Sequence, residues 1–336
     1  NVFRPGGGGL EHKNSTLLTV QAKGMETPAG WNRWLTFVAH EYVHAINVKR
    51  LRPVELGPFD YEAAPTTPSL WIAEGLTTYY ADLFVERSGL ATEQDWLGWM
   101  SKLIADLQHT PGRRVQTLSQ SSLDVWNSEA SGVGMDQSKT VSYYTKGPVV
   151  GLLLDAHIRR LTHDSASLDD VMRAAYARYG GVRGYTPAQF QATASRVAGF
   201  DLRPWFHRAL DTTGELDYRE MLDWFGLAFS DTAGPTSTWR LEPVAHPTAA
   251  QAAHLAAILR PDASRRGEGE HHAVSVGARG LPTGSHLAGA SAAAPHHSPA
   301  HAAAHHSAGG GLAAPPAAVA QVDDVAGLVF QGPAKM

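Results

Sequence analysis

The spacing of apolar and polar residues predicts a chain that is mainly helical over its first 240 residues. The first predicted helix spans residues 33–50, with apolar side chains three or four positions apart at Leu35, Val38, Ala39, Tyr42, Val43 and Ile46. The second spans residues 66–90, where Thr67 is a candidate cap, Pro68 suits the first turn and Gly89 suits the end. Three more helices are predicted at residues 145–162, 167–181 and 186–199.

One strand is predicted near the N-terminus, at residues 14–22. The glycines before it, Gly6 to Gly9, predict a loop in which the backbone can lie very close to another group. The predicted fold class is therefore α+β, mainly helical, with a small sheet near the N-terminus.

Composition divides the chain near residue 245. All nine tryptophans and all ten tyrosines precede that point, as do all phenylalanines except Phe330. Aromatic side chains supply much of the buried area of a core, so the folded domain is expected at residues 1–240. Residues 246–336, rich in Ala, His, Pro and Gly, are predicted to be a disordered low-complexity tail. The tail resembles out-of-frame translation of GC-rich coding sequence.

A formal net charge of −4 gives no reason to expect binding to nucleic acid or to an anionic membrane surface. The chain has no cysteine, which excludes disulfides and thiol nucleophiles. No apolar run reaches the ~18 residues of a membrane span. The chain begins at Asn1 without a signal peptide, and we interpret this as a cut end. Composition predicts neither a compartment nor an oligomeric state.

The most informative segment is HEYVH, residues 40–44. On a helix, positions i and i+4 lie on one face, so His40 and His44 can bind one metal ion. Glu41 would lie close to that ion and act as a general base toward a water molecule, as in zinc peptidases. Two histidines are one ligand short of a catalytic zinc site, which has three protein ligands and one open position. A chance match on an ordinary helix is the alternative interpretation.

Glu74 is the candidate third ligand. It lies within the apolar run Leu70 to Leu76, where a carboxylate is costly unless it has a partner. The alternative is a carboxylate at the helix surface, satisfied by solvent or by the positive end of the helix.

Two further groups would complete a peptidase site. Either Tyr143 or Tyr144 can donate a hydrogen bond to a tetrahedral oxyanion, although a Tyr-Tyr pair more often belongs to a core. Glu11 follows Gly8 and Gly9 and can hold the α-ammonium of a peptide, while the glycines let backbone lie against the substrate. An ordinary glycine-rich turn is the alternative.

The sequence resembles the glycyl aminopeptidases, zinc metallopeptidases of the gluzincin type that often carry a PDZ domain. Six segments occur in the order of that family: GGGGLEH, HEYVHAINVKRLRP, WIAEGLTTYY, TPGRRVQTLSQSS, SYYTKGPVVGLLLDAHIRR and SLDDVMRAAY. The resemblance covers residues 1–240 and implies a thermolysin-like catalytic domain that removes N-terminal Gly and, less strongly, Ala. It also implies an upstream β-rich domain and a PDZ domain, and this sequence shows neither.

The resemblance assigns one Zn²⁺ ion to His40, His44 and Glu74, and the general base to Glu41. It matches Tyr144, in Tyr-x-Lys-Gly, to the tyrosine that stabilises the oxyanion. A looser match assigns the α-ammonium of the substrate to Glu11, with Gly8 and Gly9 before it. The expected partners are peptides with a free N-terminus. A zinc endopeptidase and a catalytically silent metal-binding fragment are the alternative predictions.

Overall fold

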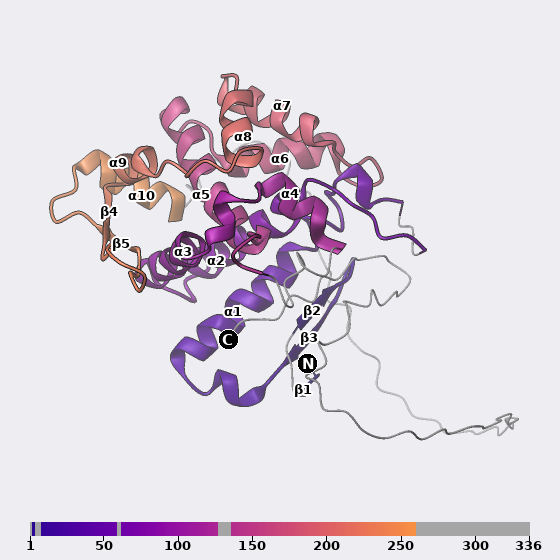
Figure 1. The fold of residues 1–336 in the computed structure, drawn as a ribbon, viewed down its shortest axis with the longest axis horizontal. Coiled ribbons are helices and arrows are strands. Elements are labelled where there is room, and N and C mark those ends of the chain that lie inside the picture. Colours follow the sequence, from indigo (N-terminus) through magenta and orange to yellow (C-terminus); the bar gives the residue numbers. More distant parts are fainter. Residues whose placement is uncertain (1, 4–7, 59–61, 127–135, 260–336) are drawn as a thin grey trace, which may run out of the picture. The chain divides into compact units, whose positions relative to one another are not determined.

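Helices form most of the described part of the chain, and a small sheet precedes them (Figure 1). The computed structural model describes residues 2–3, 8–58, 62–126 and 136–259. These residues fall in one of two compact units, and the other, Asp262–Ala313, lies outside the described residues. The α-helices are α1 (Pro28–Val43), α2 (Thr77–Arg87), α3 (Glu93–Gln108), α4 (Leu118–Leu123), α5 (Tyr143–Thr162), α6 (Leu168–Tyr179), α7 (Pro187–Ala198), α8 (Arg203–Leu210), α9 (Arg219–Phe225) and α10 (Ala249–Leu259).

The remaining elements are short. The strands are β1 (Val2–Phe3), β2 (Gly8–Glu11), β3 (Thr16–Val20), β4 (Leu227–Ser230) and β5 (Arg240–Pro243). Tight 3₁₀ turns are η1 (Ala22–Met25), η2 (Val54–Leu56), η4 (Pro111–Arg114) and η5 (Asp124–Trp126), whereas η3 (Trp71–Leu76) is a wider π-helical turn. The prediction of a mainly helical chain with a small N-terminal sheet is confirmed.

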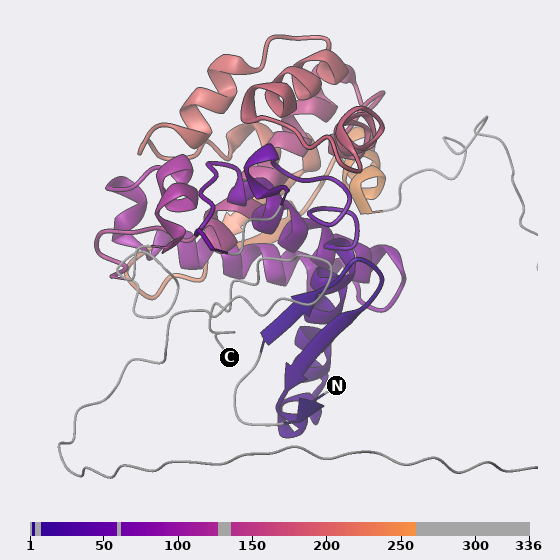
Figure 2. The ribbon, with the colours of Figure 1, turned by 90° about the vertical axis from the view of Figure 1, so that its right-hand side faces the viewer.

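The N-terminal sheet has β3 in its centre, parallel to β1 and antiparallel to β2. Figures 1 and 2 show β2 and β3 beside α1. β3 confirms the predicted strand, but Gly8 and Gly9 begin β2 and are not the predicted loop. A Cβ atom on Gly9 would lie 1.9 Å from Oε1 of Glu41, so this edge strand can lie against α1 only because Gly9 has no side chain.

Helix α1 begins one turn earlier than predicted and ends seven residues sooner, at Val43 instead of Arg50. The Thr27 hydroxyl caps its start by accepting a hydrogen bond from Gly30 N at 3.0 Å. Beyond His44 the chain turns, and the Asn47 amide donates to Ile72 O at 2.7 Å. This tertiary hydrogen bond holds residues 44–50 in a turn although their apolar spacing is helical.

The predicted helix at residues 66–90 has two parts. It begins with η3, in which the backbone is wound more loosely than in an α-helix, and continues as α2. Thr67 caps only a local turn, accepting from Ser69 N at 3.2 Å, and is not the cap of the helix. Single π-helical turns are frequent at functional sites, and this one carries Glu74.

Helices α5, α6 and α7 confirm the three predictions at residues 145–162, 167–181 and 186–199. Ser142 caps α5, while Ser167 and Thr186 form capping boxes at the starts of α6 and α7. α5 is buried along most of its length and packs against η3, α3 and α9, so it is the central helix of the core.

A buried carboxylate ties α5 to its neighbours. Asp155 is fully buried and accepts hydrogen bonds from Tyr79 Oη at 2.8 Å, Arg159 Nε at 3.1 Å and Leu168 N at 2.8 Å. The three donors come from α2, α5 and the start of α6, so a single side chain joins three helices.

We expect Asp155→Asn to lower the free energy of unfolding by about 2 kcal/mol, because charge-assisted hydrogen bonds contribute about 1.5–3 kcal/mol each and Arg159 would lose its buried counter-ion. Asp201→Asn is the matched control, since its ion pair with Arg203 is exposed and should contribute less than about 1 kcal/mol. Denaturant titration of both variants measures the difference. Equal effects would contradict a structural role for the buried network.

The prediction that the disordered tail begins at residue 246 is wrong, because one more helix follows that point. Residues 249–259 form α10, whose Leu255, Ile258 and Leu259 are buried. Arg87 of α2 donates to Ile258 O at 2.7 Å, which fixes the last turn. The prediction failed because it used aromatic residues as the sign of a core, whereas an alanine-rich helix can bury aliphatic side chains alone. The rest of the predicted tail lies outside the described residues.

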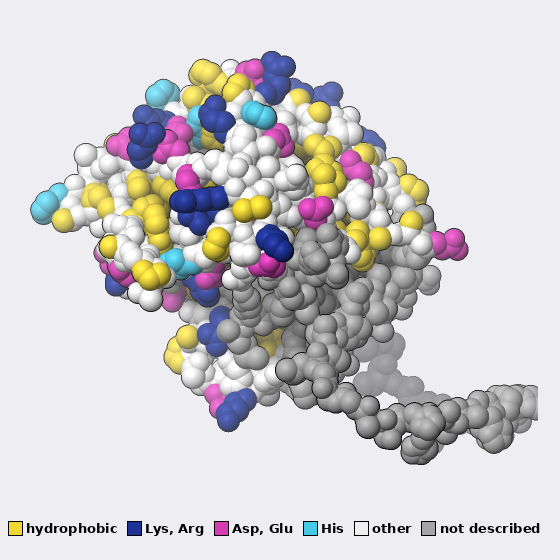
Figure 3. Space-filling view, in the orientation of Figure 1, with side chains coloured by type: hydrophobic (Ala, Val, Ile, Leu, Met, Phe, Trp, Pro, Cys, Tyr) yellow, Lys and Arg dark blue, Asp and Glu magenta, His cyan; other side chains and the backbone are white. Residues whose placement is uncertain are grey.

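Charged side chains of both signs are interspersed on the face shown in Figure 3. Several form exposed pairs, such as Lys102 with Asp106 at 2.9 Å, which contribute little stability each. Among the described helices, none is both long and apolar enough for a membrane span.

Candidate metal centre

Three predicted ligands meet at the end of α1. His40 and His44 lie one turn apart, with their Nε2 atoms 3.0 Å from each other. Glu74 Oε2 lies 3.3 Å from His40 Nε2 and 3.2 Å from His44 Nε2. The side chains of His44 and Glu74 are 3% and 7% exposed and that of His40 is 15% exposed, so the cluster meets solvent mainly at His40.

The outer nitrogens of both imidazoles have acceptors. His44 Nδ1 lies 3.0 Å from the carbonyl oxygen of Asn47, which can only accept, so Nδ1 carries the proton. His40 Nδ1 lies 3.3 Å from Thr78 Oγ1, and that hydroxyl donates its own proton to Glu74 O at 3.0 Å. In the neutral imidazoles, both Nε2 lone pairs therefore point at the Glu74 carboxylate.

Three acceptors without a donor between them need a cation or a proton. Burial favours neutral His44, but the charge of Glu74 and its hydrogen bond outweigh burial and raise the pKa of His44 to about 10. Burial, together with a positive charge on His44, lowers the pKa of His40. The cluster thus binds one positive charge strongly, held by His44 when that charge is a proton.

The donor set fits a metal ion. Ligand atoms about 2.0–2.2 Å from a tetrahedral ion lie roughly 3.3–3.6 Å apart, close to the distances between Glu74 Oε2 and the two imidazoles. Two imidazoles and a carboxylate, each deprotonated on the inner atom, form the ligand set of a catalytic zinc. The hydrogen bonds to Asn47 O and Thr78 supply the outer partners that orient such ligands.

Glu41 lies beside the cluster on α1 and is 7% exposed. Its Oε2 atom is buried and makes no hydrogen bond within the described residues. Burial raises the pKa of Glu41 to about 8, with the charges of Glu11 and Glu74 acting in the same direction and His44 and Lys49 opposing them. The carboxyl group can therefore accept and release a proton near neutral pH.

Of the two candidate tyrosines, Tyr144 has the better position. Its ring centroid lies 6.2 Å from that of His40, and it packs on Tyr143 at 4.8 Å. Burial and then the charge of Glu74 raise the pKa of both phenols well above the usual value. The charges of Glu41 and Glu11 raise the pKa of Tyr144 further.

Glu11 is also at the site, with a partner that the sequence did not predict. Lys49, in the turn after α1, places Nζ 3.4 Å from Glu11 Oε1. Glu11 contributes to the pKa shifts of His40, His44, Glu41 and Tyr144. Lys49 lies in the segment HEYVHAINVKRLRP that carries the family resemblance, but its spacing of five residues from His44 matches no metal-ligand pattern.

Two glycines bring the elements of the site together. A Cβ atom on Gly75 would lie 2.6 Å from the Cα of Gly147, and one on Gly147 would lie 2.8 Å from the Cα of Gly75. The backbones of η3 and α5 therefore cross in direct contact at these two glycines. Glu74 and Tyr144 lie next to this crossing, so it sets how far the third ligand is from the tyrosine.

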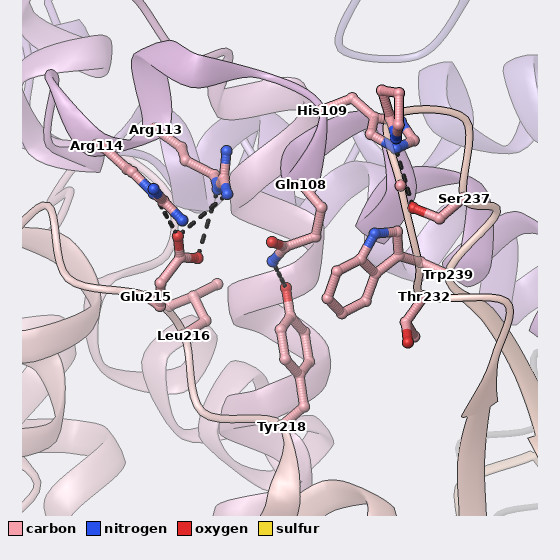
Figure 4. Close-up of a pocket in the computed structure, with 12 residues that line it drawn as sticks. Gln108, His109, Arg113, Arg114, Glu215, Leu216, Tyr218, Thr232, Ser237 and Trp239 are labelled. Carbon is pink, nitrogen blue, oxygen red and sulfur yellow. Dashed lines mark hydrogen bonds and ion pairs between the residues drawn. The ribbon is translucent and has the colours of Figure 1, made fainter.

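A cavity of about 610 Å³ lies away from the metal cluster and is lined by none of its residues. Figure 4 shows Arg113 and Arg114 pointing at Glu215, which Arg114 Nε contacts at 2.8 Å. Gln108 donates to Tyr218 Oη at 3.1 Å, so the polar side chains there are largely paired with one another. This cavity carries no candidate chemistry.

Comparison with known proteins agrees with the sequence. Residues 33–150 match the model of the M61 glycyl aminopeptidase family. Among solved structures, an aminopeptidase N family protein from Idiomarina loihiensis is similar, with 27% identity and a TM-score of 0.63. The similarity covers 68% of this chain but 40% of that chain, so this chain spans less than half of the relative. No curated protein gives a significant match. The matched residues include both histidines, Glu41, Glu74 and Tyr144, and the resemblance of this chain to the glycyl aminopeptidase family is confirmed.

Proposed function

We propose that this chain is the catalytic part of a zinc-dependent aminopeptidase with a thermolysin-like, gluzincin-type site. The observation that carries the proposal is the meeting of three acceptor atoms, from the partly exposed His40 and the buried His44 and Glu74, beside the buried carboxylate of Glu41. The family match and the aminopeptidase N relative support peptide substrates.

His40, His44 and Glu74 would hold the zinc ion. Once bound, zinc supplies Lewis-acid chemistry, which lowers the pKa of a water molecule to about 7 and polarises a carbonyl group. Glu41 accepts a proton from the attacking water and passes it to the leaving amine. Tyr144 remains protonated at neutral pH, so its hydroxyl can donate to the developing oxyanion.

The edge strand provides the substrate contacts. Glu11 binds the α-ammonium of the substrate, which selects peptides with a free N-terminus. Gly8 and Gly9, which have no side chains, would let the substrate backbone lie against this strand. Gly9 also lets the strand lie against Glu41, since a side chain there would overlap that carboxylate. A preference for N-terminal Gly and Ala is proposed from the family resemblance.

The test combines metal analysis with paired substrates. We expect one zinc ion per chain and release of p-nitroaniline from glycine and alanine p-nitroanilides, but not from their N-acetyl forms. A chelator should abolish release, and added zinc should restore it. Equal cleavage of blocked substrates would favour an endopeptidase, and bound zinc without any hydrolysis would favour a silent metal-binding fragment.

Thr78→Val is expected to weaken zinc binding by about tenfold or more, because His40 Nδ1 loses its hydrogen-bond acceptor. Removing the hydrogen-bond partner of a metal ligand typically lowers metal affinity by roughly 10–100-fold. Competition with a chromogenic chelator measures the affinity. Thr193→Val is the control, since Thr193 makes the same backbone hydrogen bond, to Gln189 O at 2.8 Å, in α7. An unchanged zinc affinity in Thr78→Val would show that the hydrogen bond between Thr78 and His40 does not contribute to metal binding.

A further inference from the structure

Lys49 and Glu11 form an ion pair that is shielded from solvent. Nζ of Lys49 lies 3.4 Å from Oε1 of Glu11, and the two side chains are 1% and 5% exposed. An ion pair at this depth has lost most of its hydration, so each partner depends on the other for its charge. Removing either charge would leave the other buried without compensation.

The pair connects the edge strand to the metal cluster. Glu11 is the last residue of β2, whereas Lys49 lies in the turn after α1. The backbone N–H of Lys49 donates to the carbonyl of His44 at 3.0 Å. Lys49 is therefore fixed to a ligand residue by its main chain and to the strand by its side chain.

Charge explains why a cation is needed at this point. Glu11 and Glu74 both act electrostatically on Glu41, where they add to the effect of burial and raise its pKa. Neighbouring carboxylates repel one another, and solvent reduces this repulsion least where the groups are buried. Lys49 offsets the negative charge of Glu11, the carboxylate on the edge strand.

Lys49 contacts the Glu11 carboxylate through Oε1, which lies 3.4 Å from Nζ. A carboxylate can accept several hydrogen bonds, so a substrate ammonium can bind Oε2 while Lys49 keeps Oε1. The arrangement fixes the carboxylate before substrate arrives, which lowers the entropic cost of binding.

We propose that Lys49 is a positioning residue for substrate recognition: it holds the Glu11 carboxylate in place so that Glu11 can bind the α-ammonium of a peptide. The inference rests on the proposed aminopeptidase function, because it assigns to Lys49 a role through Glu11. Lys49 does not itself touch the reacting atoms. A purely structural ion pair would stabilise the fold but would not change the recognition of an amine.

The test uses two small zinc-binding ligands that differ by the amine. Glycine hydroxamate carries an α-ammonium and acetohydroxamate does not, so the ratio of their Kd values measures amine recognition without any turnover. We expect the zinc-loaded wild type to prefer glycine hydroxamate. Lys49→Met and Glu11→Gln should each reduce that preference by about tenfold or more, as expected for a lost charge-assisted contact.

Three controls separate positioning from structure. Lys49→Arg keeps the charge and should retain most of the amine preference, and Lys49→Gln replaces Lys49→Met if the latter does not fold. In a Glu11→Gln background, Lys49→Met should have little further effect on the Kd ratio, because the two residues act through one contact. Zinc content and melting temperature are measured for each variant.

The outcomes distinguish this inference from the proposed function. An unchanged Kd ratio in Lys49→Met or Lys49→Gln, or an equal loss in the Glu11→Gln background, would overturn the role of Lys49. A wild type that lacks any amine preference would overturn it as well. A wild type that prefers glycine hydroxamate but hydrolyses no peptide would contradict the proposed activity and leave Lys49 in its role.

Discussion

Glu41→Gln is expected to lower kcat by about 10³-fold or more while zinc content stays at one ion per chain. Positioned acid–base groups contribute roughly 10²–10⁴-fold, and an amide cannot accept the proton that Glu41 is proposed to take. Glutamine has nearly the same shape, so the close contact with Gly9 remains and the edge strand need not move. The measurement is hydrolysis of glycine p-nitroanilide beside metal analysis.

Glu93→Gln is the matched control, because Glu93 is an exposed acid in the first turn of α3. It should keep wild-type kcat. Activity of Glu41→Gln within tenfold of wild type would contradict the assignment of the base. Loss of zinc in the same variant would show that the substitution acts on the ligands instead.

Glu41→Gln should also change how the stability of the metal-free protein depends on pH. Burial raises the pKa of Glu41 from 4.5 to about 8, so the folded state holds a proton that the unfolded state releases. The resulting destabilisation of the wild type grows as pH rises from 4.5 to 8 and is complete above that range. Glutamine does not titrate, so Glu41→Gln should melt at a higher temperature than wild type, with a difference that widens over that window.

Gly75→Ala is expected to lower the free energy of unfolding by about 3 kcal/mol and zinc affinity by about 100-fold. The added Cβ would lie 2.6 Å from the Cα of Gly147, where only a shift of the backbone can make room. Because Glu74 precedes Gly75, that shift moves the third ligand away from the histidines. Denaturant titration and chelator competition measure the two effects.

Two other glycines make a graded control series. A Cβ on Gly98 meets nothing within 4 Å, so Gly98→Ala should stabilise α3 by about 0.5–1 kcal/mol. A Cβ on Gly151 would lie 2.8 Å from Leu76 Cδ2, the mobile end of a side chain, and Gly151→Ala should fall between the two. If Gly75→Ala behaves like Gly98→Ala, the backbone crossing does not set the position of Glu74.

The sequence predicted the cluster because local spacing determines most of it. His40, Glu41 and His44 are adjacent on one helix, and Glu74 was recognisable as a charge within an apolar run. The structure brings all four together, with Tyr144 and Glu11 beside them. Their catalytic roles remain proposals.

The parts that were missed depend on tertiary contacts. Nothing local to Lys49 shows that its ammonium reaches β2, and nothing local to Gly75 shows that α5 crosses there. The end of α1 at Val43 likewise depends on a hydrogen bond from Asn47 to a carbonyl 25 positions away. The tail boundary failed for a different reason, since α10 buries aliphatic residues without any aromatic side chain.

The wide turn of η3 has a consequence for how the site responds to its ligand. Thr77 and Thr78 donate back to Ala73 O and Glu74 O at 2.7 and 3.0 Å, and the Thr78 hydroxyl also accepts a hydrogen bond from His40 Nδ1. The contacts of Glu74 with His40, of His40 with Thr78 and of Thr78 with the Glu74 carbonyl therefore form a closed ring. This ring joins the end of α1 to η3 and the start of α2. We expect a metal ion bound at the cluster to slow local unfolding of both segments together. Amide hydrogen exchange at residues 40–44 and 73–78 should therefore slow to the same extent when metal is added, as in one cooperative unit.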